Sequence, residues 1–340
     1  MEGRTQLLAI IAGIGLSVAI FALGFQRVTR DRLGPGRVAW SLPFGGPHGV
    51  AKNRGMDGKE YGPLAFSVGF PEDHATLWLA DTYHFRVMKI SQHHTTIIST
   101  PKSFLEDVGV SNKQQVFFAD NQGPIVLSLK PGSNQPAALL KQHGLGYTET
   151  IWNLAVAGRS NLWIEWVRIG HGTIHSQLER YVLTSSPREV VSAKVVNQKT
   201  IGWLAVSPSG QLYLQPLWDG QGGLWLQVYS EQGRYLKRLH LLMPRRSASA
   251  QLLGVDRRGN IYIFIPSRHR VQIFNAEGQA TLAVPVPRSP LHAWDPGYVA
   301  PDGSLFMMAS SQSRFRILRF RWHRTQLWSW HLPWAGLTKR

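Results

Sequence analysis

The sequence predicts an all-β protein: a six-bladed β-propeller preceded by one N-terminal transmembrane helix. Short apolar runs recur six times at spacings between 39 and 50 residues, which is the period of a four-stranded propeller blade. The 33 glycines and 20 prolines among 340 residues favour short strands separated by turns. An uncharged stretch near the N-terminus has the length of a membrane-spanning helix. We therefore expect an anchor with a basic juxtamembrane segment over residues 1–33 and a propeller over residues 34–340.

The uncharged stretch runs from Leu7 to Phe25. At about 1.5 Å per residue, a helix of this length crosses the hydrocarbon core of a bilayer. A cleaved signal peptide is the alternative, because Ala22-Leu23-Gly24 resembles a small-residue cleavage site. The stretch is longer than the apolar region of most signal peptides, which favours an uncleaved anchor. We therefore expect the membrane to be one partner of the chain.

The charges around this stretch give conflicting indications of orientation. Only Arg4 and the terminal amine precede it, whereas four arginines follow it, so the positive-inside rule would keep the large domain in the cytoplasm. Those four are Arg27, Arg30, Arg32 and Arg37. A head of six residues before an apolar segment is, however, how export signals begin. We expect an extracytoplasmic propeller, with the basic residues 26–32 against lipid phosphates.

Each recurrent apolar run is expected to be the second strand of a blade. The runs are LWLAD (77–81), VFFAD (116–120), LWIEW (162–166), LYLQP (212–216), IYIFI (261–265) and LFMMA (305–309). Several are preceded by a short strand and a tight-turn sequence, as in LAVSPSGQ and LGVDRRGN. A third, alternating strand and a more variable fourth strand follow each run. Four strands in six units fill residues 64–332, and each unit buries its apolar faces against its neighbours in a ring.

Two segments compete for the place that closes the ring. RVAWSLPFGG (37–46) resembles QLWSWHLPWAG (326–336), which follows the last unit as its expected fourth strand. Which of them lies outermost beside the other terminus is left open by the sequence. The residues between 47 and 64 are rich in glycine and charge, which is typical of a loop.

The repeat pattern resembles the NHL repeat family of six-bladed β-propellers. LWLADTYHFRVMKI and GNIYIFIPSRHRVQIFNAEGQ carry the resemblance best, through an apolar strand, a polar turn and Arg-Val before a third strand. In the family an asparagine commonly stands two residues before the arginine. Here His84, Arg268 and Arg314 take that place, which weakens any inference to a specific activity while leaving the architecture intact.

Composition excludes several kinds of site. The absence of cysteine excludes disulfides, thiolate nucleophiles, cysteine-ligated zinc and iron–sulfur centres. No phosphate-binding glycine loop, HExxH, EF-hand or GxSxG sequence is present. The formal charge of +17 implies attraction to anionic partners: an acidic protein, an anionic polymer, a membrane surface or nucleic acid.

Metal and catalytic candidates are weak. His93-His94 and His171 with His175 form local pairs, but they do not lie on a predicted helix whose turns would bring them together. Asp81 and Arg86, with Arg270 and Arg316 at matching positions, are best interpreted as turn-stabilising pairs because they repeat between units. We therefore expect no cofactor and assign no catalytic residue and no metal ligand.

A basic edge is the one candidate surface. In RFRILRFRWHR (314–324), strand alternation would place Arg319, Arg321 and His323 on one face, and Arg245 with Arg246 adds charge nearby in the sequence. Guanidinium groups suit phosphate and carboxylate recognition, so these five residues form a candidate polyanion-binding surface. A solvated basic strand that discourages edge pairing accounts for the pattern equally well.

These observations favour a membrane-tethered propeller that works as a binding or scaffolding module. The alternative, from a different class, is an extracytoplasmic metal-dependent hydrolase or lyase of the lactonase kind. Resemblance to propeller lactonases implies acidic and amide ligands converging on the central channel. Such a cluster cannot be assembled from residue spacing.

Overall fold

The structure, a computed structural model, describes residues 25–54, 59–69, 76–91, 94–100, 103–111, 114–121, 123, 125–141, 148–157, 161–170, 173–183, 190–198, 201–216, 224–242, 250–289, 291–292 and 296–330. The chain divides into two compact units. One unit is Pro35–Arg321, and the other combines Met1–Gly34 with Trp322–Arg340.

The larger unit contains six four-stranded antiparallel sheets in its described residues, as the sequence predicts. Blade 1 is β5 (Ala65–Gly69), β6 (Thr76–Asp81), β7 (Arg86–Ile90) and β8 (Thr95–Ser99). Blade 2 is β9 (Leu105–Val110), β10 (Val116–Asp120), β11 (Ile125–Leu129) and β12 (Ala137–Lys141). Blade 3 is β13 (Thr148–Ala157), β14 (Asn161–Gly170), β15 (Thr173–Leu183) and β16 (Val190–Gln198).

Blade 4 is β17 (Ile201–Val206), β18 (Leu212–Pro216), β19 (Leu224–Tyr229) and β20 (Tyr235–Leu241). Blade 5 is β21 (Gln251–Val255), β22 (Ile261–Ile265), β23 (Arg270–Phe274) and β24 (Ala280–Pro285). Blade 6 is β26 (Gly297–Val299), β27 (Leu305–Met308), β28 (Arg314–Phe320) and, from the other end of the chain, β2 (Arg37–Pro43). A small sheet of β3 (Asn53–Arg54), β4 (Glu60–Tyr61) and β25 (Leu291–His292) adds to these.

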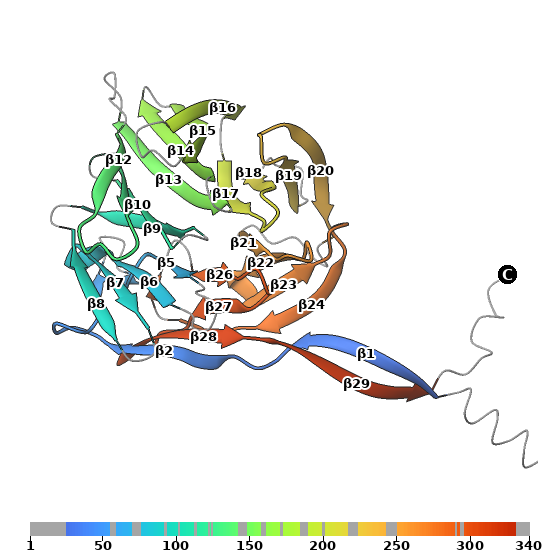
Figure 1. The fold of residues 1–340 in the computed structure, drawn as a ribbon. Coiled ribbons are helices and arrows are strands. Elements are labelled where there is room, and N and C mark those ends of the chain that lie inside the picture. The colour runs from blue at the N-terminus through green and yellow to red at the C-terminus, as the bar shows by residue number, and fades with distance from the viewer. Residues whose placement is uncertain are drawn as a thin grey trace, which may run out of the picture. The chain divides into compact units, whose positions relative to one another are not determined.

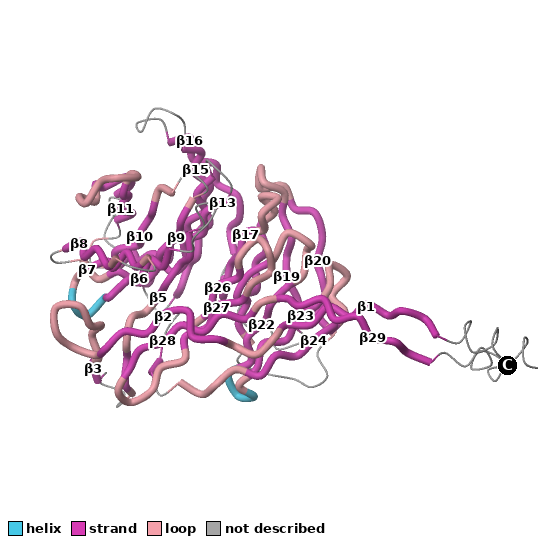
Figure 2. Tube along the Cα trace, turned by 60° about the horizontal axis from the view of Figure 1, so that its bottom comes forward, coloured by secondary structure: helices cyan, strands magenta, loops and turns pink. Residues whose placement is uncertain are grey.

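The blades form a closed ring. The first strand of every blade contacts the first strand of the next, in the order β5, β9, β13, β17, β21, β26 and back to β5, and Figure 1 shows these strands innermost. Two short 3₁₀ turns, η1 (Thr82–His84) and η2 (Pro266–Arg268), interrupt a strand-built molecule (Figure 2). The predicted six-bladed propeller is therefore confirmed.

The N-terminal segment closes the ring. Strand β2 pairs antiparallel with β28, from Arg37 opposite Arg319 to Pro43 opposite Arg314, and the two lie side by side in Figure 1. The expectation that residues 326–332 form the fourth strand of the last blade is wrong. That segment belongs largely to β29 (Trp322–Trp330), which pairs instead with β1 (Phe25–Leu33). The segments 37–46 and 326–336 have similar sequences, so only the strand with which each one pairs distinguishes them.

The smaller unit contains the two-stranded antiparallel sheet of β1 and β29. Its register runs from Phe25 opposite Trp330 to Leu33 opposite Trp322. Phe25, the last residue of the expected membrane helix, begins β1, and residues 7–24 lie outside the described residues. Among the residues that are described, no helix combines the length and apolarity that crossing a bilayer requires.

The core lies between neighbouring blades, so the second strand of a blade is covered on both faces. Every residue of β6, β10 and β27 is buried. This explains why these strands read as continuous apolar runs in the sequence instead of alternating. A valine near the end of each first strand pairs with the leading apolar residue of the second strand in all six blades. The six are Val68, Val110, Val156, Val206, Val255 and Val299.

Candidate functional site: the central channel

A cavity of about 660 Å³ lies at the centre of the ring. All six first strands contribute to its wall, and the turns that follow β17, β21 and β26 contribute Ser207 to Ser209, Arg257 and Asp302. Each first strand is an edge strand of its sheet, hydrogen-bonded on one side only. Backbone N–H and C=O groups on the other edge have no sheet partner, so they supply polar groups to the wall. The cavity has the size and mixed lining of a small-molecule site.

Small residues let the first strands approach one another. A Cβ at Gly109 would lie 2.6 Å from Cγ2 of Val156, and a Cβ at Gly254 would lie 2.8 Å from Cβ of Val299. Real Cβ atoms do not approach other atoms this closely, so these glycines are required by the spacing of blades 2 and 3 and of blades 5 and 6.

Asp107 and Asn153 bring polar side chains to the wall at blades 2 and 3. Asp107 on β9 uses Oδ1 to accept the Val108 N–H at 2.7 Å and Oδ2 to accept the Leu154 N–H at 2.6 Å. Its carboxylate therefore joins β9 to β13. Asn153 on β13 donates from Nδ2 to Glu165 Oε2 and, at 3.4 Å, to the carbonyl of Gly202 on β17. One amide thus contacts blades 3 and 4 while lining the cavity.

Two glutamates, Glu165 fully buried and Glu106 partly buried, lie on the strands of blades 2 and 3. Glu165 on β14 has no exposed surface, and burial raises its pKa to about 7 against the opposing effect of Asn153 and Ser176. Glu106 on β9 accepts from Asn121 Nδ2, and burial likewise raises its pKa to about 7. Asn121 Oδ1 in turn accepts the Ile151 N–H at 3.0 Å, which joins blade 2 to blade 3. Both glutamates are largely protonated below neutral pH.

The opposite side of the cavity differs in character. Tyr298 on β26 packs against Phe306. Burial, and to a lesser extent the negative charge of Asp302, raise the pKa of its phenol above the usual range for tyrosine. The phenol therefore stays protonated and remains a hydrogen-bond donor. Arg257 is exposed at the cavity and adds positive charge there.

The side chains of this channel do not fit a calcium or zinc site. Within the described residues, no group of three or more acidic or histidine side chains is placed to hold a metal ion. Both oxygens of Asp107 accept backbone N–H groups, and Asp302 accepts from the Ser304 N–H and hydroxyl and lies 3.6 Å from Arg319. A hard cation needs several free oxygens at one point. His93 and His171 lie outside the described residues.

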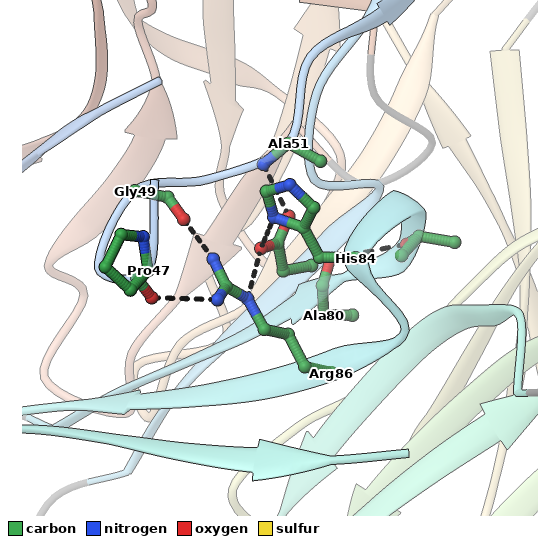
Figure 3. Close-up of polar contacts among 8 residues, drawn as sticks. Pro47, Gly49, Ala51, Ala80, His84 and Arg86 are labelled. Carbon is green, nitrogen blue, oxygen red and sulfur yellow. Dashed lines mark hydrogen bonds and ion pairs between the residues drawn. The ribbon is translucent and has the colours of Figure 1, made fainter. Parts of the chain in front are cut away.

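Asp81 and Arg86 form a structural clasp, as the sequence interpretation holds. Asp81 is fully buried and accepts from Arg86 Nε at 2.8 Å, His84 Nδ1 at 2.9 Å and the Ala51 N–H at 2.8 Å. Arg86 also donates to the carbonyls of Pro47 and Gly49 (Figure 3). The network ties the loop after the ring-closing strand to blade 1.

The expected repetition of this pair fails in blade 5. Strand register places Ile265 opposite Arg270, where blade 1 has Asp81 opposite Arg86. Within the described part of the chain, Nε and Nη2 of Arg270 are buried without a hydrogen-bond partner. Blade 5 therefore repeats the arginine of blade 1 but has isoleucine in place of the aspartate.

The structure divides the predicted basic surface. Strand β28 ends at Phe320 and β29 begins at Trp322, so Arg319 and Arg321 belong to the propeller unit and His323 to the other unit. The three residues therefore do not lie on one continuous strand, and their common face stays a prediction. Arg319 lies over the ring of Phe306 at 5.2 Å, and burial and Arg321 lower its pKa while Asp302 opposes this. Arg321 and His323 are exposed, and Arg245 and Arg246 lie outside the described residues. Polyanion binding stays a prediction.

Sequence reasoning missed the channel residues. Asp107, Asn153 and Tyr298 stand out only when the first strands are aligned on their shared valine, because the neighbouring positions are then mostly small or apolar. The recurrent valine was the available signal.

Comparison with known proteins agrees with this architecture. No protein-family model matches the chain, and no curated protein sequence matches it. Among solved structures, a gluconolactonase from Xanthomonas campestris aligns with a TM-score of 0.55 at 16% identity, over 88% of this chain and 100% of that one. The calcium-binding protein regucalcin from Agrobacterium tumefaciens aligns with a TM-score of 0.53 at 12% identity, over 79% and 95%.

A catalytically inactive virginiamycin B lyase from Staphylococcus aureus, solved with quinupristin, aligns with a TM-score of 0.51 at 9% identity, over 86% of this chain and 99% of that one. At these identities the likeness concerns the fold. The chain is thus a six-bladed β-propeller, consistent with an NHL-like propeller, whose structural neighbours include gluconolactonases and virginiamycin B lyase.

Proposed function

We propose that the protein binds a small organic molecule in its central channel. The observation that carries this proposal is the cavity of about 660 Å³ with Asn153, Tyr298 and Arg257 on its wall. Its volume lies in the usual range for small-molecule sites, and its wall offers both apolar surface and polar groups that could orient a ligand. Two structural neighbours, a gluconolactonase and a virginiamycin B lyase, act on small organic molecules according to their names, which supports this proposal over surface scaffolding.

Ligand-observed NMR with a fragment library tests the proposal. Ser209 is exposed and lines the cavity, so Ser209→Trp adds bulk at the mouth without entering the core. We expect fragments that bind the native protein to lose binding in this variant. Asn134→Trp, at an exposed turn between β11 and β12, is the matched control and should keep binding. Fragments that bind Ser209→Trp as well as the native protein would place the site elsewhere.

A second candidate function is hydrolysis or elimination of a lactone-like substrate in the same channel. The specific observation in its favour is that the aligned structures include a gluconolactonase and a lyase. Because the described side chains do not fit a metal, we propose that such turnover would not depend on the carboxylates described here holding calcium. Panels of five- and six-membered lactones, with and without a chelator, test this. Turnover that the chelator abolishes would overturn the metal-independent form of the proposal.

The membrane tether and the acidic partner also remain proposals. The apolar residues 7–25 and the charge of +17 support a chain held at a membrane, with its propeller outside the cytoplasm and its basic surface toward an anionic partner. Membrane fractionation with carbonate washing tests the anchor, and protease protection in sealed vesicles tests the side. A chain released by carbonate would argue against an integral anchor.

A further inference from the structure

The side-chain amide of Asn153, on the channel wall at blade 3, is held in one orientation by hydrogen bonds to residues outside the cavity lining. Asn153 is 8% exposed and lines the cavity. Both of its hydrogen bonds use Nδ2, one to Glu165 Oε2 and one to the Gly202 carbonyl. A backbone carbonyl can only accept, so turning the amide over would place two acceptors against each other. The NH₂ group is therefore directed into the seam between blades.

These bonds leave the carbonyl oxygen of the same amide available to the cavity that Asn153 lines. Within the described residues, no hydrogen bond occupies Asn153 Oδ1, and this atom is not among the buried polar atoms that lack a partner. An unoccupied amide oxygen on a cavity wall is an acceptor for a ligand. The neighbouring carboxylate of Asp107, bonded to the Leu154 N–H, makes this part of the wall more favourable for a donor than for an anion.

Glu165 holds the amide in this orientation. Its side chain is completely buried, and Oε2 accepts the hydrogen bond from Asn153. Glu165 touches no atom of the cavity wall other than through Asn153 in the contacts described, so it acts as a positioning residue. Either protonation state leaves Oε2 able to accept from Asn153.

We infer that Asn153, oriented by Glu165, is a specificity-determining acceptor that selects ligands presenting a hydroxyl or N–H donor to blade 3. The inference rests on the proposed function, since it concerns the ligand of that same channel. It adds what the ligand must present: a donor toward β13. Arg257, after β21, adds positive charge at another part of the wall.

A matched pair of probes tests the inference on the full chain: cyclohexanol and methoxycyclohexane, which share a ring and an oxygen and differ in the donor. A net hydrogen bond of ordinary strength corresponds to a preference of about 3- to 10-fold. We expect the native protein to prefer cyclohexanol by that factor in ligand-observed NMR titrations. In Asn153→Leu the preference should vanish, and in the exposed control Asn134→Leu it should persist.

Two variants of Glu165 separate positioning from simple packing. Glu165→Gln keeps an acceptor for Asn153 and should retain the preference, whereas Glu165→Leu removes the acceptor and should reduce it. Circular dichroism and melting curves establish that each variant is folded, and the Glu165 pair provides the test if Asn153→Leu does not fold. Equal binding of both probes by the native protein would overturn the inference alone. A different outcome would overturn the proposed function and the inference together. In that outcome, neither probe binds, and no library fragment loses binding in the Ser209→Trp variant.

Discussion

The buried carboxylate of Asp81 accepts three hydrogen bonds, and two of its partners are cationic or can become so. Replacing it by alanine would leave the guanidinium of Arg86, whose side chain is 12% exposed, without its counter-ion. Breaking a buried pair from one side costs about 3–5 kcal/mol. We expect Asp81→Ala to lower the free energy of unfolding by that amount in urea denaturation. Because the pair itself is worth less, Asp81→Ala combined with Arg86→Met should recover part of the loss.

A glycine between blades provides a second test at the residue scale. A Cβ at Gly109 would collide with Val156 and, at 2.8 Å, with Leu154. Overpacking of this kind costs about 1–3 kcal/mol. Gly109→Ala should therefore lower the melting temperature. An unchanged melting temperature would show that Val156 and Leu154 can shift enough to accommodate the methyl group at no cost.

The raised pKa of Glu165 makes stability depend on pH. Its folded pKa of about 7 exceeds the ordinary 4.5, so the folded state binds the proton more tightly than the unfolded chain does. The stability linked to this proton is complete below about pH 4.5 and is lost as the pH rises through about 7. The loss is at most about 3–4 kcal/mol. Glu165→Gln should flatten the decline between pH 5 and 8 measured by urea denaturation, with the contribution of Glu106 remaining.

At the scale of the element, strand β2 matters more than β29 for the ring. Strand β2 completes blade 6, whereas β29 pairs with β1 and belongs to none of the six sheets. A chain ending at Arg321 should therefore retain the melting behaviour of the propeller. A chain beginning at Gly45 should lose blade 6 to limited proteolysis, because β28 would become an unpaired edge. Equal protease resistance of the two truncated chains would contradict the pairing of β2 with β28.

The elements that the sequence predicted well are those whose burial leaves a local pattern. Second strands covered on both faces, such as β6 and β10, produce uninterrupted apolar runs at blade spacing, so the six sheets followed from periodicity. The closing strand did not, because 37–43 and 326–332 have similar local patterns. Only the hydrogen bonds between β2 and β28, far apart in the chain, distinguish them.

The channel wall was hidden for a related reason. Asp107, Asn153 and Glu165 each look unremarkable along the chain, and their relation exists only across blades, in contacts such as Asp107 with the Leu154 N–H. The basic surface stays a prediction, but one assumption behind it does not hold. Alternation along 314–324 assumed one continuous strand, and the break between Phe320 and Trp322 removes that assumption.

At the scale of the whole molecule, the excess of 37 lysines and arginines over 20 acids governs encounters with anionic surfaces. We expect the full chain, in mild detergent, to be retained on an anionic polymer column and to elute with salt, because released counter-ions drive such binding. If the exposed Arg321 takes part, Arg321→Ala should reduce the slope of log affinity against log salt concentration by about 1, the value of one ionic contact. An unaltered slope would remove Arg321 from the polyanion-binding surface.

Because β2 pairs with β28, the ring can close only after nearly the whole chain has been synthesised. Ser41 and its partner Arg314 are 273 residues apart, so β2 leaves the ribosome long before the strand it must join exists. At typical rates of synthesis this interval is roughly 15–55 s. Any blades that fold during this interval would lack a neighbour at both ends of the row, because the ring closes only through β2 and β28. Chaperones that shield such ends during translation would act on this protein for almost the whole of its synthesis, and would be released when the last blade captures the first strand.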